Sequence, residues 1–227
     1  RRLKELAWEL ADARRYKQFA IPKSNGGLRI ISEPIDSLKE IQRLLLVILE
    51  RSYEPLGNSH GFISRRSILT NAKPHVRKPW VFNTDIEKFF PTIRMERIKE
   101  VLSDIRLKFL LDVSGNQNAV TLKEVKLSNE IVSLLANLCC FRTVEGSDDP
   151  ESWYGLPQGA PTSPILSGMV ARKMDEDILS FCADRGIEYT RYADDLSFSP
   201  LDPKDYYGYK QLNNNNLFSN AQRNIRV

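Results

Sequence analysis

Residues 192–195 read Tyr192-Ala193-Asp194-Asp195, and they lie between two short runs of β-type sequence, Ile187 to Tyr192 and Leu196 to Phe198. Extended segments on both sides of a short polar centre predict a β-hairpin with two adjacent carboxylates at its turn. This stretch decides the fold, because a strand that pairs with the hairpin brings the residue at its own end close to Asp194 and Asp195.

A second acidic turn is predicted at Asp85. The residues from Trp80 to Ile86 are typical of a buried strand that ends at this aspartate. If that strand lies beside the hairpin, Asp85, Asp194 and Asp195 converge at one edge of a sheet. Three carboxylates in that arrangement suit two divalent metal ions, and their hard oxygen atoms favour Mg²⁺. For each aspartate taken alone, an ordinary turn residue is the open alternative.

The rest of the sequence predicts a mixture of hairpins and helices. Asn25-Gly26 is typical of a tight turn, so a second β-hairpin is expected between Phe19 and Ile31. Ser37 followed by Glu40 has the pattern of a capping box at a helix N-terminus. Helices are expected over residues 3–16, 37–52, 91–102, 128–141 and 162–186, and a loop around residues 114–116. Antiparallel hairpins combined with long helices indicate an α+β fold.

The composition restricts the class of protein. Of the 227 residues 41% are hydrophobic and 27% are charged, as in ordinary globular domains. No apolar run approaches the roughly 20 residues of a membrane-spanning helix, so no membrane partner is expected. The cysteines at 139, 140 and 182 have the spacing of neither a disulfide framework nor a zinc site. The net charge of +4 does not by itself indicate nucleic-acid binding; the basic residues between Arg65 and Lys78 suit either phosphate contacts or a solvated surface.

Four motifs taken together resemble the reverse transcriptases. Tyr192-Ala193-Asp194-Asp195 resembles the family's signature, and Asn83 to Ile93 resembles its first carboxylate motif. Gly155 to Pro164 resembles its nucleotide-binding turn, and Ile21 to Arg29 its fingers hairpin. The motifs follow the family's order along most of the chain. The resemblance implies a right-hand polymerase whose antiparallel palm sheet is backed by helices, with RNA-directed DNA polymerase (nucleotidyltransferase) activity.

The resemblance also implies a catalytic centre. Asp85, Asp194 and Asp195 would be the catalytic carboxylates and the ligands of two Mg²⁺ ions. The backbone carbonyl of Ile86 would be a further metal ligand. Tyr192 would lie near the primer terminus, although a buried tyrosine in a strand is the plainer alternative.

A nucleotide-binding set follows from the same resemblance. Lys23 and Arg29 would neutralise the phosphates of a dNTP, with surface charges on an exposed hairpin as the alternative. Phe90 would clash with the 2′-hydroxyl of a ribonucleotide and so select deoxynucleotides, whereas its neighbour Phe89 suits the core better. Gln158 lies in a proline- and glycine-flanked turn that lets the chain approach a nucleotide closely.

The stretch Asn71-Ala72-Lys73-Pro74-His75 resembles the retron reverse transcriptases, bacterial enzymes that copy a dedicated structured RNA. This implies a structured template RNA and an RNA–DNA hybrid as partners, a branched RNA–DNA product (msDNA), and an effector protein in antiphage defence. Asn71 and His75 are the RNA-binding candidates, but His75 equally suits holding its loop by a hydrogen bond. Intron maturases, diversity-generating and abortive-infection enzymes, and a non-catalytic RNA-binding scaffold remain alternatives.

The same resemblance divides the chain into subdomains. Fingers are expected at residues 1–79 and 94–150, and palm at 80–93 and 151–227. Reverse transcriptases continue beyond the hairpin with a primer grip and a thumb, so a chain ending at Val227 is expected to be a fragment that lacks the thumb. The opening residues have no secretory cleavage signal, and a bacterial cytoplasmic location is expected.

Overall fold

A β-hairpin opens the computed structural model, which describes residues 15–23, 26–112, 120–142 and 154–213. Strands β1 (Tyr16–Pro22) and β2 (Leu28–Pro34) pair in antiparallel fashion, and the Lys23 N–H donates to the Gly27 carbonyl at 2.7 Å. Gly26 has a φ of 83°, the left-handed backbone that glycine adopts without cost. The predicted hairpin is present. Most of the helix expected over residues 3–16 lies outside the described residues, and Tyr16 belongs to β1.

Helix α2 (Asp36–Ser52) follows directly, ends where it was expected to end, and buries Leu38, Gln42, Leu45 and Leu49. The predicted capping box at Ser37 is wrong. The residue at the N-cap is Ile35, which makes no side-chain cap. Its N–H instead donates to the Arg15 carbonyl at 2.8 Å, so a contact with the chain entering β1 sets the start of the helix.

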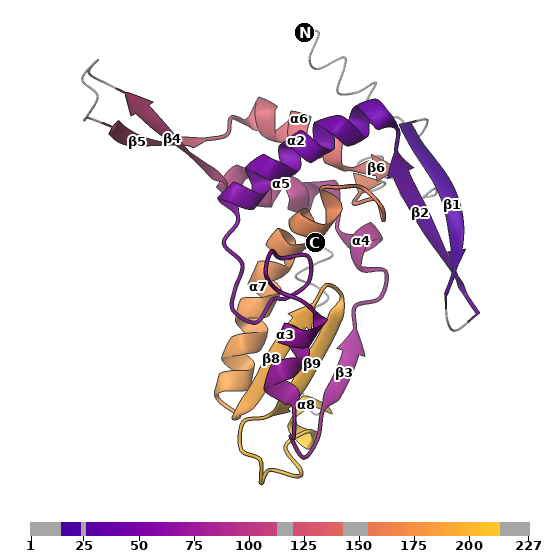
Figure 1. Ribbon diagram of the computed structural model, residues 1–227, viewed down its shortest axis with the longest axis vertical. Helices are drawn as coiled ribbons and strands as arrows, with labels where there is room; N and C mark the ends of the chain where they lie inside the picture. Colours follow the sequence, from indigo (N-terminus) through magenta and orange to yellow (C-terminus); the bar gives the residue numbers. More distant parts are fainter. Residues whose placement is uncertain (1–14, 24–25, 113–119, 143–153, 214–227) are drawn as a thin grey trace.

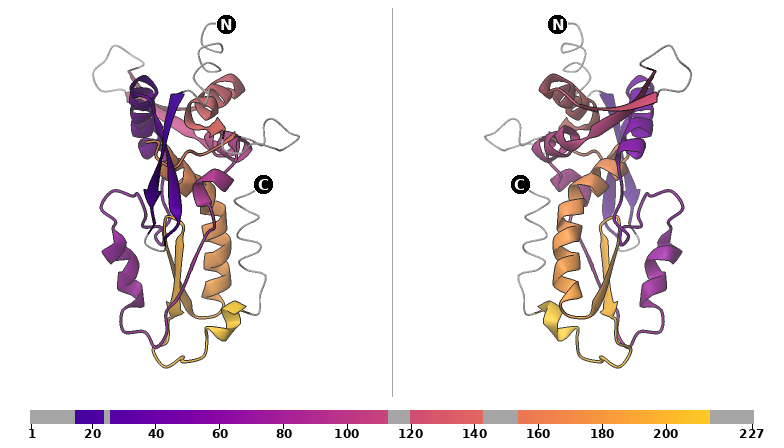
Figure 2. Two further views of the ribbon diagram at one scale, coloured as in Figure 1. Left: turned by 90° about the vertical axis from the view of Figure 1, so that its right-hand side faces the viewer. Right: turned by 90° about the vertical axis from the view of Figure 1, so that its left-hand side faces the viewer.

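A three-stranded antiparallel sheet has the strand order β3-β9-β8. Its strands are β3 (Phe82–Asp85), β8 (Ile187–Tyr192) and β9 (Asp195–Pro200). Helix α7 (Ser163–Ala183) packs against this sheet, and α3 (Ile68–Ala72), continued by η2 (Lys73–His75), lies on the other side of it (Figures 1 and 2). The strand expected at Asp85 and the hairpin at Asp194 are therefore neighbours in one sheet.

The helix expected over residues 91–102 is two helices, α4 (Phe89–Thr92) and α5 (Met95–Asp104). Between them Ile93 is extended, and its carbonyl accepts from the Leu156 N–H at 3.1 Å. Arg94 forms an isolated bridge with Gly155. Hydrogen bonds to a segment distant in sequence thus replace those that would have continued the helix.

Two further regions complete the upper part of the molecule in Figure 1. Strands β4 (Arg106–Asp112) and β5 (Val120–Lys126) form a projecting hairpin that was not predicted. The loop expected at residues 114–116 lies outside the described residues. Helix α6 (Asn129–Cys139) begins where it was predicted, after Ser128, whose hydroxyl accepts from the Ile131 N–H, but it ends two residues before Phe141, which belongs to β6. After it, β6 (Phe141–Arg142) pairs with β7 (Tyr154–Gly155).

One hydrophobic core connects these layers. It includes Leu49 of α2, Ile98 of α5, Met174 of α7 and Phe198 of β9, each at most 1% exposed. The proposed fingers and palm ranges therefore share a core. The described residues end with the short helix α8 (Lys210–Asn213). Among the described residues, no helix is both long enough and apolar enough to cross a bilayer.

Candidate active site

Strand pairing brings the three aspartates to one edge of the sheet. Asp85, the last residue of β3, is the register partner of Asp195, the first residue of β9. The N–H of Ile86 donates to the Asp194 carbonyl at 3.0 Å, which extends the pairing into the turn. Asp85 and Asp195 are exposed and Asp194 is half-buried, so this edge is open to solvent and to ligands.

The charges of these carboxylates interact. The pKa of Asp195 is raised above its usual value, first by burial and then by the negative charges of Asp194 and Asp85. In the described part of the chain, no three His, Cys, Asp or Glu side chains close on a metal ion as they stand. An open set of repelling carboxylates nevertheless fits Mg²⁺, because that ion keeps several waters and completes its coordination with substrate phosphates.

The turn that carries Asp194 has an unusual backbone. Tyr192 and Asp195 are register partners, so Ala193 and Asp194 form the two central residues of a tight turn. Ala193 has a φ of 58°, a left-handed value that is uncommon for a residue with a Cβ atom. Gly61 lies against this turn, since a Cβ atom at Gly61 would come 2.4 Å from the Ala193 nitrogen. Alanine gives no sequence signal for such a backbone.

Three aromatic rings lie beside the turn. Phe90 is half-buried on α4, whereas Phe89 is 2% exposed and belongs to the core, as predicted. The Phe62 ring has its centroid 6.4 Å from that of Phe90 and 6.4 Å from that of Tyr192. Phe62 was not assigned a role from the sequence, where a lone aromatic in a loop carries no periodic signal. It connects the expected nucleotide and primer residues into one aromatic group.

The β1–β2 hairpin is joined to the turn that contains Gln158. The Ser32 N–H of β2 donates to the Gln158 carbonyl at 2.8 Å. Gly159, with a φ of 129°, packs so closely that a Cβ atom there would lie 2.8 Å from a methyl carbon of Ile31. Lys23 and Arg29 are exposed near the tip of this hairpin, and no hydrogen bond joins either to the aspartates among the described residues. The hairpin and the Gln158 turn therefore form one structural unit.

His75 is in the interior, with an exposed fraction of 7%. Its Nδ1 lies 2.7 Å from the Ser199 hydroxyl and its Nε2 2.8 Å from the Thr190 hydroxyl. The Thr190 hydroxyl donates to the Asn71 carbonyl at 3.2 Å, which leaves its oxygen to accept from a protonated Nε2. Burial, then the neighbouring Lys78, lowers the pKa of His75 and keeps the ring neutral. The ring thus holds its loop against β8 and β9, one of the two predicted alternatives.

Asn71 is equally buried, at 7% exposure, and its Oδ1 has no hydrogen-bond partner among the described residues. Its backbone is engaged at both ends, because its N–H donates to the Ser67 carbonyl at 3.0 Å and its carbonyl accepts from Thr190. Asn71 and His75 therefore lie together, but their side chains do not face solvent.

The amino-acid sequence of the chain is similar to those of known proteins. A family model described as reverse transcriptase (RNA-dependent DNA polymerase) matches residues 21–205. The retron Mx162 and retron Mx65 reverse transcriptases of Myxococcus xanthus are 34% and 33% identical over 84% and 82% of the chain. The retron Ec83 reverse transcriptase of Escherichia coli is 31% identical over 82%. The chain spans 37%, 40% and 53% of these proteins' own lengths.

Among solved structures, a telomerase from Candida albicans in complex with a fragment of telomeric RNA matches with a TM-score of 0.51. The identity is 16%, and the match covers 90% of the chain and 40% of the telomerase, so this likeness bears on the fold alone. The predicted α+β polymerase fold and the resemblance to retron reverse transcriptases are both confirmed. The chain belongs to the family of reverse transcriptases, the RNA-dependent DNA polymerases.

Proposed function

We propose that the chain carries the catalytic centre of an RNA-directed DNA polymerase, which adds deoxynucleotides to a primer on an RNA template. The observation that carries this proposal is the pairing of Asp85 with Asp195, extended by the Ile86–Asp194 hydrogen bond. Family membership supplies the class of reaction, and the paired strand ends supply a site at which it can occur.

In the proposed centre, the carboxylates of Asp85, Asp194 and Asp195 and the carbonyl of Ile86 hold two Mg²⁺ ions. The raised pKa of Asp195 supports this set, since carboxylates that repel one another are stabilised by a cation. When bound, the ions supply activation of the primer hydroxyl and neutralisation of triphosphate charge. The protein's own contribution is to hold the carboxylates at the fixed ends of paired strands.

The nucleotide site is proposed to lie between the β1–β2 hairpin and the sheet edge. Lys23 and Arg29 at the exposed hairpin tip neutralise the triphosphate, and the turn at Gln158, which binds β2, positions the nucleotide. Phe90 excludes the 2′-hydroxyl, and its contact with Phe62 keeps the ring from moving aside. Tyr192, next to the carboxylate turn, lies beside the primer terminus.

The replacement Asp194→Asn in the intact protein is expected to abolish Mg²⁺-dependent primer extension on an RNA template, because it removes one of the proposed metal ligands. The control is Asp177→Asn, which removes an exposed carboxylate from an ion pair with Lys173 on α7. Such a pair contributes little, so this variant should extend primers like the wild type. DNA synthesis by Asp194→Asn at the control's rate would contradict the assignment.

The replacement Asp195→Asn distinguishes the contribution of Asp195 to metal binding from its effect on the stability of the metal-free protein. At neutral pH the ionised Asp195 is destabilised in the folded state, first by burial and then by repulsion from Asp194 and Asp85, as its raised pKa indicates. This cost is absent below the usual carboxyl pKa, grows as the pH rises from that value towards the raised one, and is fully present above it. The neutral amide should therefore raise the Tm in EDTA, and Mg²⁺ should raise the Tm of the wild type more than that of the variant. A lower Tm for Asp195→Asn in EDTA would contradict the proposed repulsion.

We further propose a retron-type enzyme that uses a structured template RNA in the bacterial cytoplasm to make a branched RNA–DNA molecule, with an effector protein as partner in antiphage defence. The 31% to 34% identity to retron reverse transcriptases supports this subtype. Asn71 and His75 contribute, in this proposal, by fixing the loop at residues 67–76 against the sheet rather than by touching RNA.

The nucleic acid that purifies with the protein tests the subtype. The retron proposal predicts a DNA strand joined covalently to one cognate RNA, detected by sequencing before and after ribonuclease treatment. Intron-derived RNA or varied cDNA without a branch would favour an intron maturase or a diversity-generating enzyme instead. Tight RNA binding with no incorporation under any metal condition would favour the non-catalytic scaffold.

A further inference from the structure

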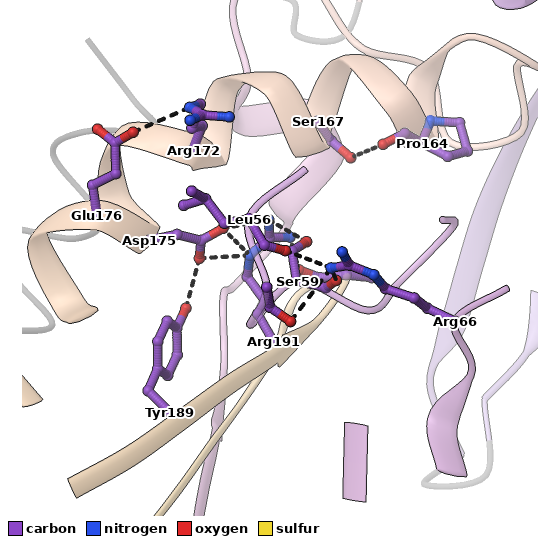
Figure 3. A network of polar contacts seen from close by, with 12 residues as sticks. Leu56, Ser59, Arg66, Pro164, Ser167, Arg172, Asp175, Glu176, Tyr189 and Arg191 are labelled. Atoms are coloured by element: carbon purple, nitrogen blue, oxygen red, sulfur yellow. Dashed lines mark hydrogen bonds and ion pairs between the residues drawn. The ribbon is translucent and has the colours of Figure 1, made fainter. Parts of the chain in front are cut away.

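A pair of opposite charges is buried between α7 and β8. Arg191 is 2% exposed and Asp175 is 1% exposed. The Arg191 Nε donates to the Asp175 Oδ1 at 2.8 Å and Nη2 donates to Oδ2 at 2.7 Å, a fork-to-fork ion pair (Figure 3). Burial alone would lower the pKa of Arg191, but the Asp175 carboxylate raises it above its usual value, so the guanidinium stays charged.

Stability by itself does not account for this pair. Removing two charges from water costs free energy. Proteins in which apolar side chains of similar volume replace a buried ion pair are often at least as stable. The geometry shows what the charges add. The two parallel bonds to the Asp175 oxygens fix the planar guanidinium in rotation as well as in position. The Tyr189 hydroxyl also donates to the Asp175 Oδ1 at 2.7 Å but does not contact Arg191 through this bond.

The remaining donors of Arg191 reach the carboxylate turn. Nη1 donates to the Ala193 carbonyl at 2.9 Å. That carbonyl belongs to the peptide that leads into Asp194. On the other side of Asp194, its own carbonyl accepts from the Ile86 N–H at 3.0 Å. Both peptides that flank Asp194 are therefore tied down, one by β3 and one by the buried guanidinium.

The same arginine joins the turn to the edge segment, residues 58–61. The Arg191 Nη2 donates to the Ser59 hydroxyl at 3.1 Å. Its backbone N–H donates to the Asn58 carbonyl at 2.8 Å, and its carbonyl accepts from the His60 N–H at 2.8 Å. The edge segment ends at Gly61, which packs on the Ala193 nitrogen. A left-handed Ala193 is thus held between its own strand and this segment.

We propose that Arg191, oriented by Asp175, is a positioning residue that fixes the backbone of Ala193 and thereby places the Asp194 and Asp195 carboxylates for metal binding. This inference rests on the proposed function, both for the metal site and for its link to DNA synthesis, and metal affinity can be measured without DNA synthesis. Asp175 acts through Arg191 from the buried face of α7 and touches neither substrate nor metal. Loss of the guanidinium fork allows the turn to relax, which moves the carboxylates apart from one another.

The deciding variant is Arg191→Lys, which keeps a positive charge beside Asp175 but cannot bind both carboxylate oxygens, Ala193 and Ser59 together. The matched control is Tyr189→Phe, which removes a buried hydrogen bond to Asp175 and leaves every Arg191 contact in place. Both variants are expected to lower the Tm. Only Arg191→Lys should change metal affinity, by about 10–100-fold, the range for residues that orient ligands.

Two readouts separate positioning from a general loss of stability. The first is Mn²⁺ binding to the intact protein without nucleic acid, followed by electron paramagnetic resonance. The second is primer extension, in which Arg191→Lys should raise the Mg²⁺ concentration for half-maximal rate and lower kcat, with the KM for primer–template unchanged. If the wild type makes no DNA, the proposed function fails, and the Mn²⁺ measurement still decides the present inference.

The inference is overturned if folded Arg191→Lys binds Mn²⁺ as the wild type does, or if Tyr189→Phe weakens Mn²⁺ binding as much. If Arg191→Lys does not fold, Asp175→Asn decides in its place. It is isosteric, keeps one carbonyl oxygen for the guanidinium and removes the charge that orients it. Weaker Mn²⁺ binding by this variant supports the inference, and wild-type binding overturns it.

Discussion

The antiparallel pairing of β3 with β9 is the constraint on which the rest of the structure depends. It places Asp85 opposite Asp195, and through Ile86 it fixes the carbonyl of Asp194. Side chains on one strand alternate between faces, so a slip of one residue would send Asp85 to the other face of the sheet. The rings of Phe82 and Phe198, which are register partners with centroids 6.2 Å apart, help to set this register.

Placing three carboxylates at one edge of the sheet is electrostatically unfavourable, because their negative charges repel one another. The raised pKa of Asp195 reflects first its burial and then the like charges of Asp194 and Asp85. Rigid surroundings supply the constraint: the sheet on one side, the Arg191–Asp175 pair below the turn, and the edge segment against Ala193. In the proposed metal site, these elements would hold the carboxylates in place without contacting a cation themselves.

The sequence was sufficient for features that depend on local pattern. Asn25-Gly26 predicted a hairpin, Ser128 a helix start, and the acidic residues after two β-type segments a common site. Ordered motifs then identified the family, which composition and charge did not. For His75 the sequence left open either RNA contact or a loop-holding hydrogen bond, and its contacts with Ser199 and Thr190 match the second.

Features that depend on tertiary contacts were not predictable. The break between α4 and α5 results from pairing of Ile93 and Arg94 with a segment far along the chain. The N-cap of α2 is Ile35 and not Ser37, because the Ile35 N–H donates to the Arg15 carbonyl. Phe62 contacts Phe90 and Tyr192, and Asp175 pairs with Arg191, only because the fold brings separate elements together. No spacing in the sequence connects Phe62 or Asp175 to Asp194.

The convergence of Asp85 with Asp194 and Asp195 on bound metal is tested most directly by replacing Mg²⁺ with Fe²⁺ and generating hydroxyl radicals at the bound ion. The chain should be cut at two places distant in sequence, near Asp85 and near Asp194–Asp195, and excess Mg²⁺ should suppress both cuts together. Cleavage at only one of these segments, or cleavage that Mg²⁺ does not suppress, would contradict a shared metal site.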